Sequence, residues 1–166
     1  MIRKKKKFAW PKKLYDKTRI LDENKLLEKY GLKNKKEIWK TEAKIKYFRS
    51  RAKYLITADM EEQKLFFAKL NKIGLKVNSI ADVLALNKED LMRRRLTTIL
   101  VDKNFSNSPK EARQMIVHKR VRIDNRTVNV PGYLINVAEE ANISIKIPSK
   151  IKVSARESED MKESNG

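Results

Sequence analysis

Cationic side chains gather in the stretch SPKEARQMIVHKRVRIDN, residues 108–125, which begins like a helix and ends like a β-hairpin. Arginine forks and lysine ammonium groups bind phosphate, and the first turns of a helix add backbone N–H groups and a positive dipole. We therefore expect this unit, together with the arginines before it, to grip a phosphate backbone. The side chains expected on this surface are Arg93, Arg94, Arg95, Lys110, Arg113, Gln114, His118, Lys119, Arg120 and Arg122.

His118 is the only histidine of the chain, which also lacks cysteine. A metal centre needs several such ligands, and a general base needs a nucleophile or a paired carboxylate, which the sequence does not place beside His118. The ordinary interpretation is an RNA contact or a cation at the end of a helix. The four glycines are isolated, so no phosphate-binding glycine loop is expected. We expect no enzymatic activity, cofactor or metal.

Positive charge dominates the composition, with a net charge of +19 over 166 residues. Residues 1–92 and residues 93–153 are both basic, whereas residues 154–166 are acidic. A nucleic acid that touches both basic regions is the natural partner, and a generally basic surface is the alternative. No apolar run approaches the length of a membrane span, and MIRKKKKFAWPKKLY lacks the apolar segment of a signal peptide. We therefore expect a soluble, cytoplasmic protein without membrane contact.

The first part of the chain is predicted to be an extended basic arm, residues 1–21, followed by a helical domain, residues 22–93. Trp10 could anchor the arm either on RNA or on the domain. Asp22 is expected to cap a short helix that ends at Gly31, and Asn34 a long helix that runs to about Ile56. Three pairs with the spacing of a capping box predict further helix starts. The pairs are Asp59 with Glu62, Ser79 with Asp82 and Asn87 with Asp90.

Two faces of the long helix differ in character. One face repeats at alternating three- and four-residue steps and should be buried. Its members are Ile38, Thr41, Ile45, Phe48, Ala52 and Leu55. The other face carries Lys36, Lys40 and Lys44, with Arg51 further along, and is either solvated or laid against phosphates. Tyr47 is the aromatic residue with the best case for stacking on a base.

Residues 94–153 predict a mixed α+β unit, and residues 154–166 a disordered tail. LTTILVDKNF should form a helix of about three turns, and Ser108 with Pro109 and Glu111 should begin a second helix ending near His118. VRI-DN-RTV predicts a hairpin that turns at Asp124-Asn125. YLINV and ISIKI predict two more short strands.

These residues carry a resemblance. RRLTTILVDKNFSNSPKEARQMIVHKRVRIDNRTVNVPGYLINV resembles the RNA-binding domain named after the fourth protein of the small ribosomal subunit. WPKKLYDKTRI and YGLKNKKEIWK resemble the archaeal and eukaryotic branch of that ribosomal protein family. The resemblance implies two helices packed on a short antiparallel sheet, the alpha-L RNA-binding type, behind a helical domain.

The resemblance also implies a structural role in the small subunit and in its assembly. Its partners would be the 5′ domain of small-subunit ribosomal RNA, the fifth small-subunit protein, and messenger RNA where it enters the subunit. Carried over residue by residue, it implies RNA contacts at Arg94, Arg95, Ser108, Lys110, Arg113, Gln114, His118, Lys33, Asn34, Lys35, Lys36 and Lys40. With the neighbouring cations Lys4, Lys5, Lys6, Lys44, Lys119 and Arg120, these are the predicted contacts. Trp39 and Ile38 should pack in the core.

Three other functions stay open at this point. The same domain serves as the RNA grip of some RNA-modifying enzymes, a free RNA chaperone could use it, and two short helices could form a DNA-binding helix-turn-helix. The sequence also departs from the family pattern: Asn104 and Lys119 stand where glycine is usual, and Asp124-Asn125 stands where the hairpin pair is usually Asn-Gly. Asparagine tolerates a left-handed backbone at a cost that glycine avoids, so we expect the fold to survive these changes.

Overall fold

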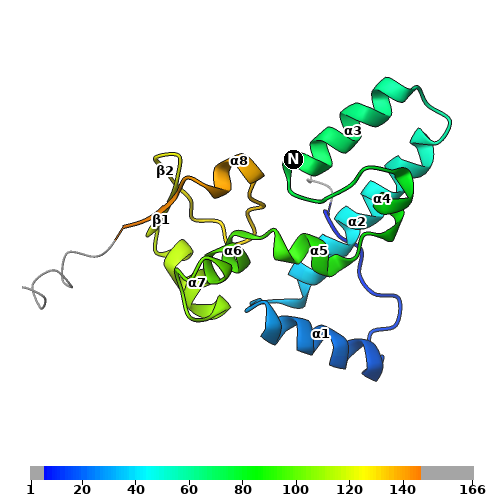
Figure 1. Cartoon of the computed structure of the whole chain (residues 1–166). Helices are drawn as coiled ribbons and strands as arrows, with labels where there is room; N and C mark the ends of the chain where they lie inside the picture. The colour runs from blue at the N-terminus through cyan, green and yellow to red at the C-terminus, as the bar shows by residue number, and fades with distance from the viewer. Residues whose placement is uncertain (1–5, 147–166) are drawn as a thin grey trace, which may run out of the picture.

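Helices fill the N-terminal part of the protein, and a smaller unit of helices and strands forms the rest (Figure 1). The computed structural model describes residues 6–146. The first five helices are α1 (Lys17–Lys29), α2 (Lys35–Leu55), α3 (Met60–Lys72), α4 (Ile80–Ala85) and α5 (Lys88–Arg93). The remaining elements are α6 (Leu96–Asp102), α7 (Pro109–Val117), β1 (Val121–Ile123), β2 (Arg126–Thr127), α8 (Val137–Glu140) and β3 (Ile143–Ile145). The predicted α+β class is confirmed.

Helix α2 organises the N-terminal part. All six positions of the predicted apolar stripe are buried, and the helix packs against α1, α4 and α5. Ile45, Phe48 and Ala52 join one core cluster with residues of α3 to α5, whereas Ile38 joins a second cluster with residues of α1. The alternating spacing predicted this face correctly because it follows the helical period.

Helix α1 begins earlier than predicted, at Lys17, with Asp16 in the N-cap position. The extended arm to residue 21 and the Asp22 cap are therefore wrong, since Asp22 lies exposed inside the helix. Arg19 donates to Glu23 at 2.6 Å, one helical turn later, and this pair supports the added first turns.

The predicted helix starts are present, although not every capping bond forms. Ser79 accepts from the backbone N–H of Asp82, whose carboxylate accepts from Ser79 N at 2.9 Å, so this box is complete. Asn87 N donates to Asp90 at 2.8 Å. Asp59 occupies the N-cap position of α3 without a side-chain cap bond, so the box predicted with Glu62 is wrong.

In the C-terminal part, α6 and α7 pack on a three-stranded antiparallel sheet of order β2-β1-β3. The predicted hairpin forms, with Ile123 opposite Arg126 and with Asp124 and Asn125 both at positive φ, as a type I′ turn requires. The predicted YLINV strand is wrong. Leu134 makes a single bridge with Arg95, and the chain then coils into α8.

Four non-glycine residues of the described chain have positive φ, and three of them stand where the family pattern has glycine, whereas Asp124 stands where it has asparagine. They are Asn104, Lys119, Asp124 and Asn125. Asn104 follows α6 and ends it after two turns, which is shorter than predicted. After α7, Lys119 has φ of 58°, and Arg120 N donates back to Met115 O at 3.0 Å. This is the Schellman closure that favours glycine at the Lys119 position.

Candidate nucleic-acid interface

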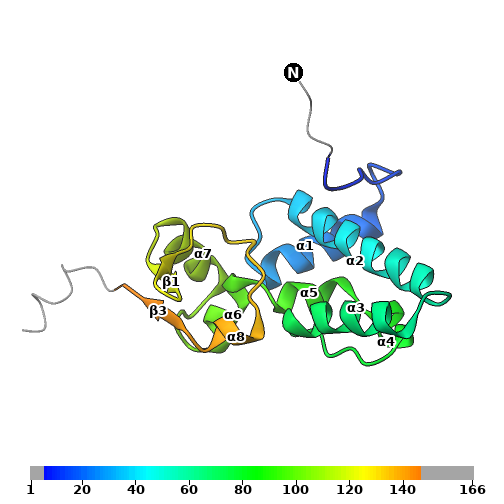
Figure 2. The ribbon, with the colours of Figure 1, turned by 90° about the horizontal axis from the view of Figure 1, so that it is seen from above.

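The two parts of the molecule meet at a hollow of about 710 Å³. Helix α2 forms one wall, and the segment from Val130 to Leu134 forms the other. Figure 2 shows the two parts side by side, joined at the step from α5 to α6. The cations that line the hollow are Lys7, Lys36, Lys40, Lys44, Arg95 and Arg113. Glu37 is the one acidic residue among the described residues of this lining.

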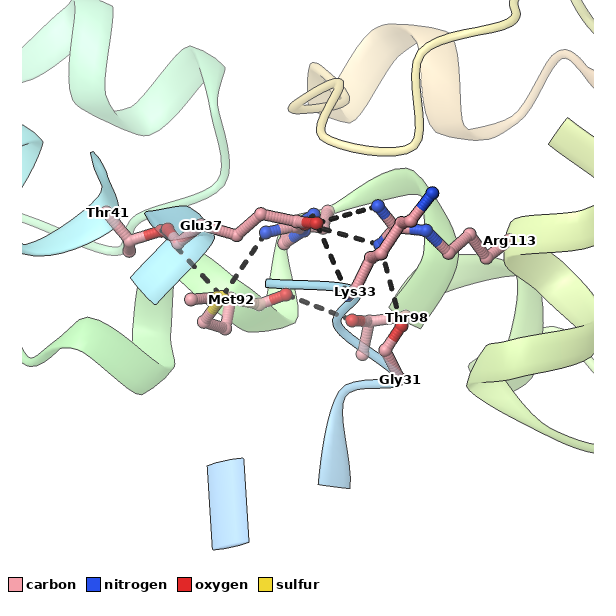
Figure 3. Close-up of polar contacts among 8 residues, drawn as sticks. Gly31, Lys33, Glu37, Thr41, Met92, Thr98 and Arg113 are labelled. Atoms are coloured by element: carbon pink, nitrogen blue, oxygen red, sulfur yellow. Dashed lines mark hydrogen bonds and ion pairs between the residues drawn. The ribbon is translucent and has the colours of Figure 1, made fainter. Parts of the chain in front are cut away.

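Glu37 on α2 pairs with Arg95 and Arg113 of the C-terminal part, and these three residues form the Glu37 clasp (Figure 3). Its Oε1 accepts from Nη2 of Arg113 on α7 at 2.6 Å, and its Oε2 accepts from Nη2 of Arg95. Arg113 also donates to Gly31 O at 3.5 Å. One carboxylate therefore ties two arginines of the C-terminal part to the N-terminal part.

Burial raises the pKa of Glu37, but the hydrogen bonds from Arg113 and Arg95 outweigh it, so the net pKa lies below the ordinary value. The carboxylate is ionised at neutral pH and neutralises part of the charge of two guanidinium groups. Because both ions have lost part of their hydration, well-aligned hydrogen bonds between them must offset that loss in addition to the attraction of their charges.

Arg94 forms a second tie on the other side of the same junction. Its Nε donates to Ile73 O at 2.8 Å, after α3, and its Nη2 lies 2.8 Å from Glu140 Oε2 on α8. Gly74 makes room for this side chain, since a Cβ there would lie 2.7 Å from the Arg94 guanidinium carbon. The consecutive arginines Arg94 and Arg95 therefore fasten the two parts through different partners.

This arrangement changes the interpretation of three predicted RNA contacts. Arg95 is only 5% exposed, which removes it from the surface that a phosphate backbone could reach. Arg94 and Arg113 are half-buried and hold protein partners, and their RNA contacts stay predictions. No local pattern indicates these pairings, because Glu37 and Arg113 lie 76 residues apart.

The other predicted contacts on α7 and its end are accessible. Ser108 accepts from Glu111 N at 3.2 Å and caps the helix, while the Glu111 carboxylate accepts from Asn107 N at 2.9 Å. Lys110, Gln114 and His118 follow one another at four-residue steps on the exposed face. Lys119 and Arg120 are exposed beyond the helix end.

The predicted contacts near α2 also reach solvent. Lys33, Asn34, Lys36, Lys40 and Lys44 are all exposed. Lys35 is partly buried and lies 3.5 Å from the buried carboxylate of Glu23, which also accepts from Arg19 and from Trp39 Nε1. Burial raises the pKa of Glu23, and these hydrogen bonds bring it below the ordinary value.

The arm docks on the domain through aromatic rings. Trp10 lies 5.2 Å from Trp39 between ring centroids, and Phe8 packs against both. Lys36 Nζ lies 5.7 Å from the Trp10 ring. Of the two anchors left open for Trp10, the domain is therefore the one seen. Lys6 is exposed, whereas Lys4 and Lys5 lie outside the described residues.

Lys7 and Tyr133 also line the hollow, and neither was among the predicted contacts. Lys7 was not distinguished from the many other cations of the arm, and Tyr133 was expected in a strand. The Tyr133 hydroxyl donates to Glu139 at 2.9 Å. Burial raises the pKa of Tyr133, and this hydrogen bond raises it further. Across residues 6–146, no helix has both the length and the apolar character needed to cross a membrane.

Comparison with known proteins agrees with this architecture. The family model of the S4 domain matches residues 94–140, which include α6, α7, the hairpin and α8. The chain is 36% identical over 154 residues to small ribosomal subunit protein uS4 of Methanothermobacter thermautotrophicus, covering 89% of this chain and 90% of that protein. With the uS4 proteins of Saccharolobus islandicus and Methanococcus aeolicus, identity is 37% over 155 residues and 42% over 133 residues. The match to the Saccharolobus islandicus protein covers 89% of this chain and 86% of that protein. The match to the Methanococcus aeolicus protein covers 76% of this chain and 75% of that protein.

The protein therefore contains an S4 domain and belongs to the uS4 family of small ribosomal subunit proteins. The resemblance found in the sequence is confirmed.

Proposed function

We propose that this protein is a structural constituent of the small ribosomal subunit that binds small-subunit ribosomal RNA. The observation that carries the proposal is the hollow between the two parts, where four exposed lysines meet and the one acidic residue of the described lining, Glu37, is already paired with Arg95 and Arg113. The four lysines are Lys7, Lys36, Lys40 and Lys44. Phosphate groups would replace water and counterions around these cations, and the released counterions would drive binding.

The two exposed cationic sets have different tasks in this proposal. Lys36, Lys40 and Lys44 of α2 bind phosphates at the hollow, while Lys110 and His118 bind them along the outer face of α7. Because the Glu37 clasp fixes α7 against α2, the two sets keep a constant separation. A folded RNA with phosphates at that separation binds without first reorganising the protein.

The proposal includes the finer points that the family resemblance implies. The RNA is the 5′ domain of the small-subunit ribosomal RNA, and binding helps to nucleate subunit assembly. The neighbours are other small-subunit proteins, including the fifth, and the messenger RNA where it enters the subunit. The cytoplasmic ribosome is its location, and no reaction, metal or cofactor is assigned to it.

A salt titration of RNA binding tests the proposal. We expect log affinity for small-subunit RNA to fall linearly with log salt, by about 0.7–0.9 for each phosphate neutralised. The triple variant Lys36→Ala, Lys40→Ala, Lys44→Ala should lower the slope by about two to three. The matched control Lys25→Ala, Lys64→Ala, Lys72→Ala removes the same charge from exposed sites on α1 and α3 and should change the slope less.

Sedimentation tests the assembly role separately. A tagged chain should co-sediment with small subunits at one copy per subunit, and crosslinks should map to the 5′ domain of their RNA. A chain that binds RNA in vitro yet stays at the top of the gradient would refute the ribosomal role and leave a free RNA-binding protein. A flat salt response would refute phosphate binding itself.

A further inference from the structure

Helix α2 carries a second stripe beside its buried one. Six residues follow at steps of four, four, three, four and three, and at 100° per residue they fall within an arc of about 80°. All six are exposed. They are Lys36, Lys40, Lys44, Tyr47, Arg51 and Tyr54. The stripe runs for about 27 Å along the helix and therefore extends well past the hollow between the two parts.

Two tyrosines interrupt the cations of this stripe. Tyr47 is 65% exposed and Tyr54 is 64% exposed, and neither belongs to a core cluster. The guanidinium carbon of Arg51 lies 5.1 Å from the centroid of the Tyr54 ring. Single exposed aromatic residues need no explanation, but aromatic rings that alternate with cations along one face form the surface that single-stranded nucleic acids use.

The surface beside Tyr47 is also hollowed. A hollow of about 440 Å³ lies between α2 and α3, and it is separate from the one between the two parts. Leu65 and Phe66 contribute apolar side chains to it, Arg51 and Lys69 contribute cations, and Glu62 contributes one carboxylate. A flat aromatic base fits the apolar surface, and its phosphate would find a cation within the same hollow.

We propose that this face of α2 binds a single-stranded segment of RNA, with unpaired bases stacked on Tyr47 and Tyr54 and phosphates on the four cations. The inference rests on the proposed function for its RNA partner and adds the site and the unpaired state of the RNA. The two tyrosines are about 10 Å apart along the helix, which is the rise of about three stacked bases.

Charge favours RNA over a protein partner at this face. The stripe holds four cations and no carboxylate, and Glu62 on α3 reaches Arg51 only at 3.7 Å between exposed side chains. The lysine end of the stripe also lines the hollow between the two parts, where the proposed function already places phosphates. One RNA strand can therefore follow α2 continuously from that hollow to the tyrosines.

Substitution of the tyrosines tests the stacking. Each of Tyr47→Ala and Tyr54→Ala should weaken binding to small-subunit RNA by about fivefold or more, since one stacked base contributes at least that factor. The salt slope should stay unchanged, because no phosphate contact is removed. Tyr47→Phe and Tyr54→Phe keep the ring and should bind like the parent. Met60→Ala, at an exposed apolar residue off the stripe, is the control and should also bind like the parent.

A crosslinking readout separates stacking from a merely structural effect. Small-subunit RNA carrying 5-iodouridine should crosslink on irradiation to Tyr47 or Tyr54, at nucleotides unpaired in the RNA. Alanine variants that bind RNA like the parent would overturn the inference. Weakening seen only when other ribosomal proteins are present would also overturn it and would assign this face to a protein partner. Failure of the parent chain to bind the RNA would refute the proposed function first.

Discussion

Arg113 on α7 reaches Glu37 on α2, with its Nη2 atom 2.6 Å from Oε1 of the carboxylate. Arg95 donates to the same carboxylate from the start of α6. The side chains of Glu37 and Arg113 are about one-fifth exposed, so water screens this cluster only partly. One acidic residue therefore holds two arginines of the C-terminal core against the N-terminal part, beside the separate bond from Arg94 to Ile73 O.

Removal of the shared carboxylate should destabilise the fold. We expect Glu37→Ala to lower the free energy of unfolding by about 3 kcal/mol, because two half-buried or buried guanidinium groups would lose their partner. Urea denaturation at neutral pH measures this loss. The matched control is Glu42→Ala on the same helix, whose exposed pair with Lys46 should contribute less than about 1 kcal/mol. Equal losses for both variants would contradict the role of the clasp.

Acid should weaken the same clasp. The folded-state pKa of Glu37 lies below its ordinary value of 4.5, so its ionised form is the one that the fold stabilises. Its contribution is complete above the unfolded-state pKa and is lost as the pH falls through the folded-state pKa. The difference in unfolding free energy between the parent and Glu37→Gln should therefore shrink from pH 6 to pH 3. Urea denaturation over this range is the measurement, and a constant difference would show that the pKa shift is absent.

A glycine after α7 should stabilise the fold while weakening RNA binding. Lys119 holds a left-handed backbone with φ of 58°, which glycine adopts without steric cost. Lys119→Gly should raise the free energy of unfolding by about 1 kcal/mol. It also removes an exposed cation, so RNA affinity at low salt should fall if Lys119 contacts phosphate.

Lys110→Gly is the control for this change. It removes the same charge from the first turn of α7 and should lower stability by up to about 1 kcal/mol, because glycine is a poor helix former. Thermal unfolding should show a higher melting temperature than the parent for Lys119→Gly and a lower one for Lys110→Gly. If Lys119→Gly were as destabilising as Lys110→Gly, the left-handed conformation at residue 119 would be incorrect.

Gly31 should tolerate no side chain. It has φ of 57°, and an added Cβ would lie 2.8 Å from both the carbonyl carbon and the Cβ of Pro109 at the start of α7. Gly31→Ala should therefore cost more than about 1 kcal/mol, since the start of α7 must move away from the segment between α1 and α2. Gly132→Ala is the control, because its Cβ would meet Arg95 Nη2 at an ordinary 3.7 Å. Urea denaturation of the two variants should separate them clearly.

Local patterns in the sequence predicted the helices and the hairpin well. The buried face of α2 follows from the spacing of its apolar residues, and the Asp124-Asn125 turn follows from two residues that tolerate positive φ. The YLINV segment shows the limit of such patterns. Its residues have strand propensity, but Leu134 is engaged by Arg95 and Tyr133 O accepts from Leu96 N, so tertiary contacts hold it beside α6 instead of in the sheet.

The site was predictable only where charges stay exposed. The spacing correctly predicted that three lysines of α2 reach solvent, because no carboxylate of the described residues forms an ion pair with them. They are Lys36, Lys40 and Lys44. Arg95 and Arg113 look the same in sequence, yet Glu37 holds both. From the sequence alone, any cation of a basic protein can be predicted to bind the ligand. Only the folded structure shows which cations are already paired with a carboxylate that is distant along the chain.

The shared Glu37 carboxylate also matters for attempts to dissect the protein. A fragment that begins at residue 94 would keep Arg95 and Arg113 but lose their counter-ion. Both guanidinium groups would then be free to attract any polyanion offered to the fragment. Affinities measured on such a truncated piece would overstate what these arginines contribute in the intact chain, and only full-length variants report their true share.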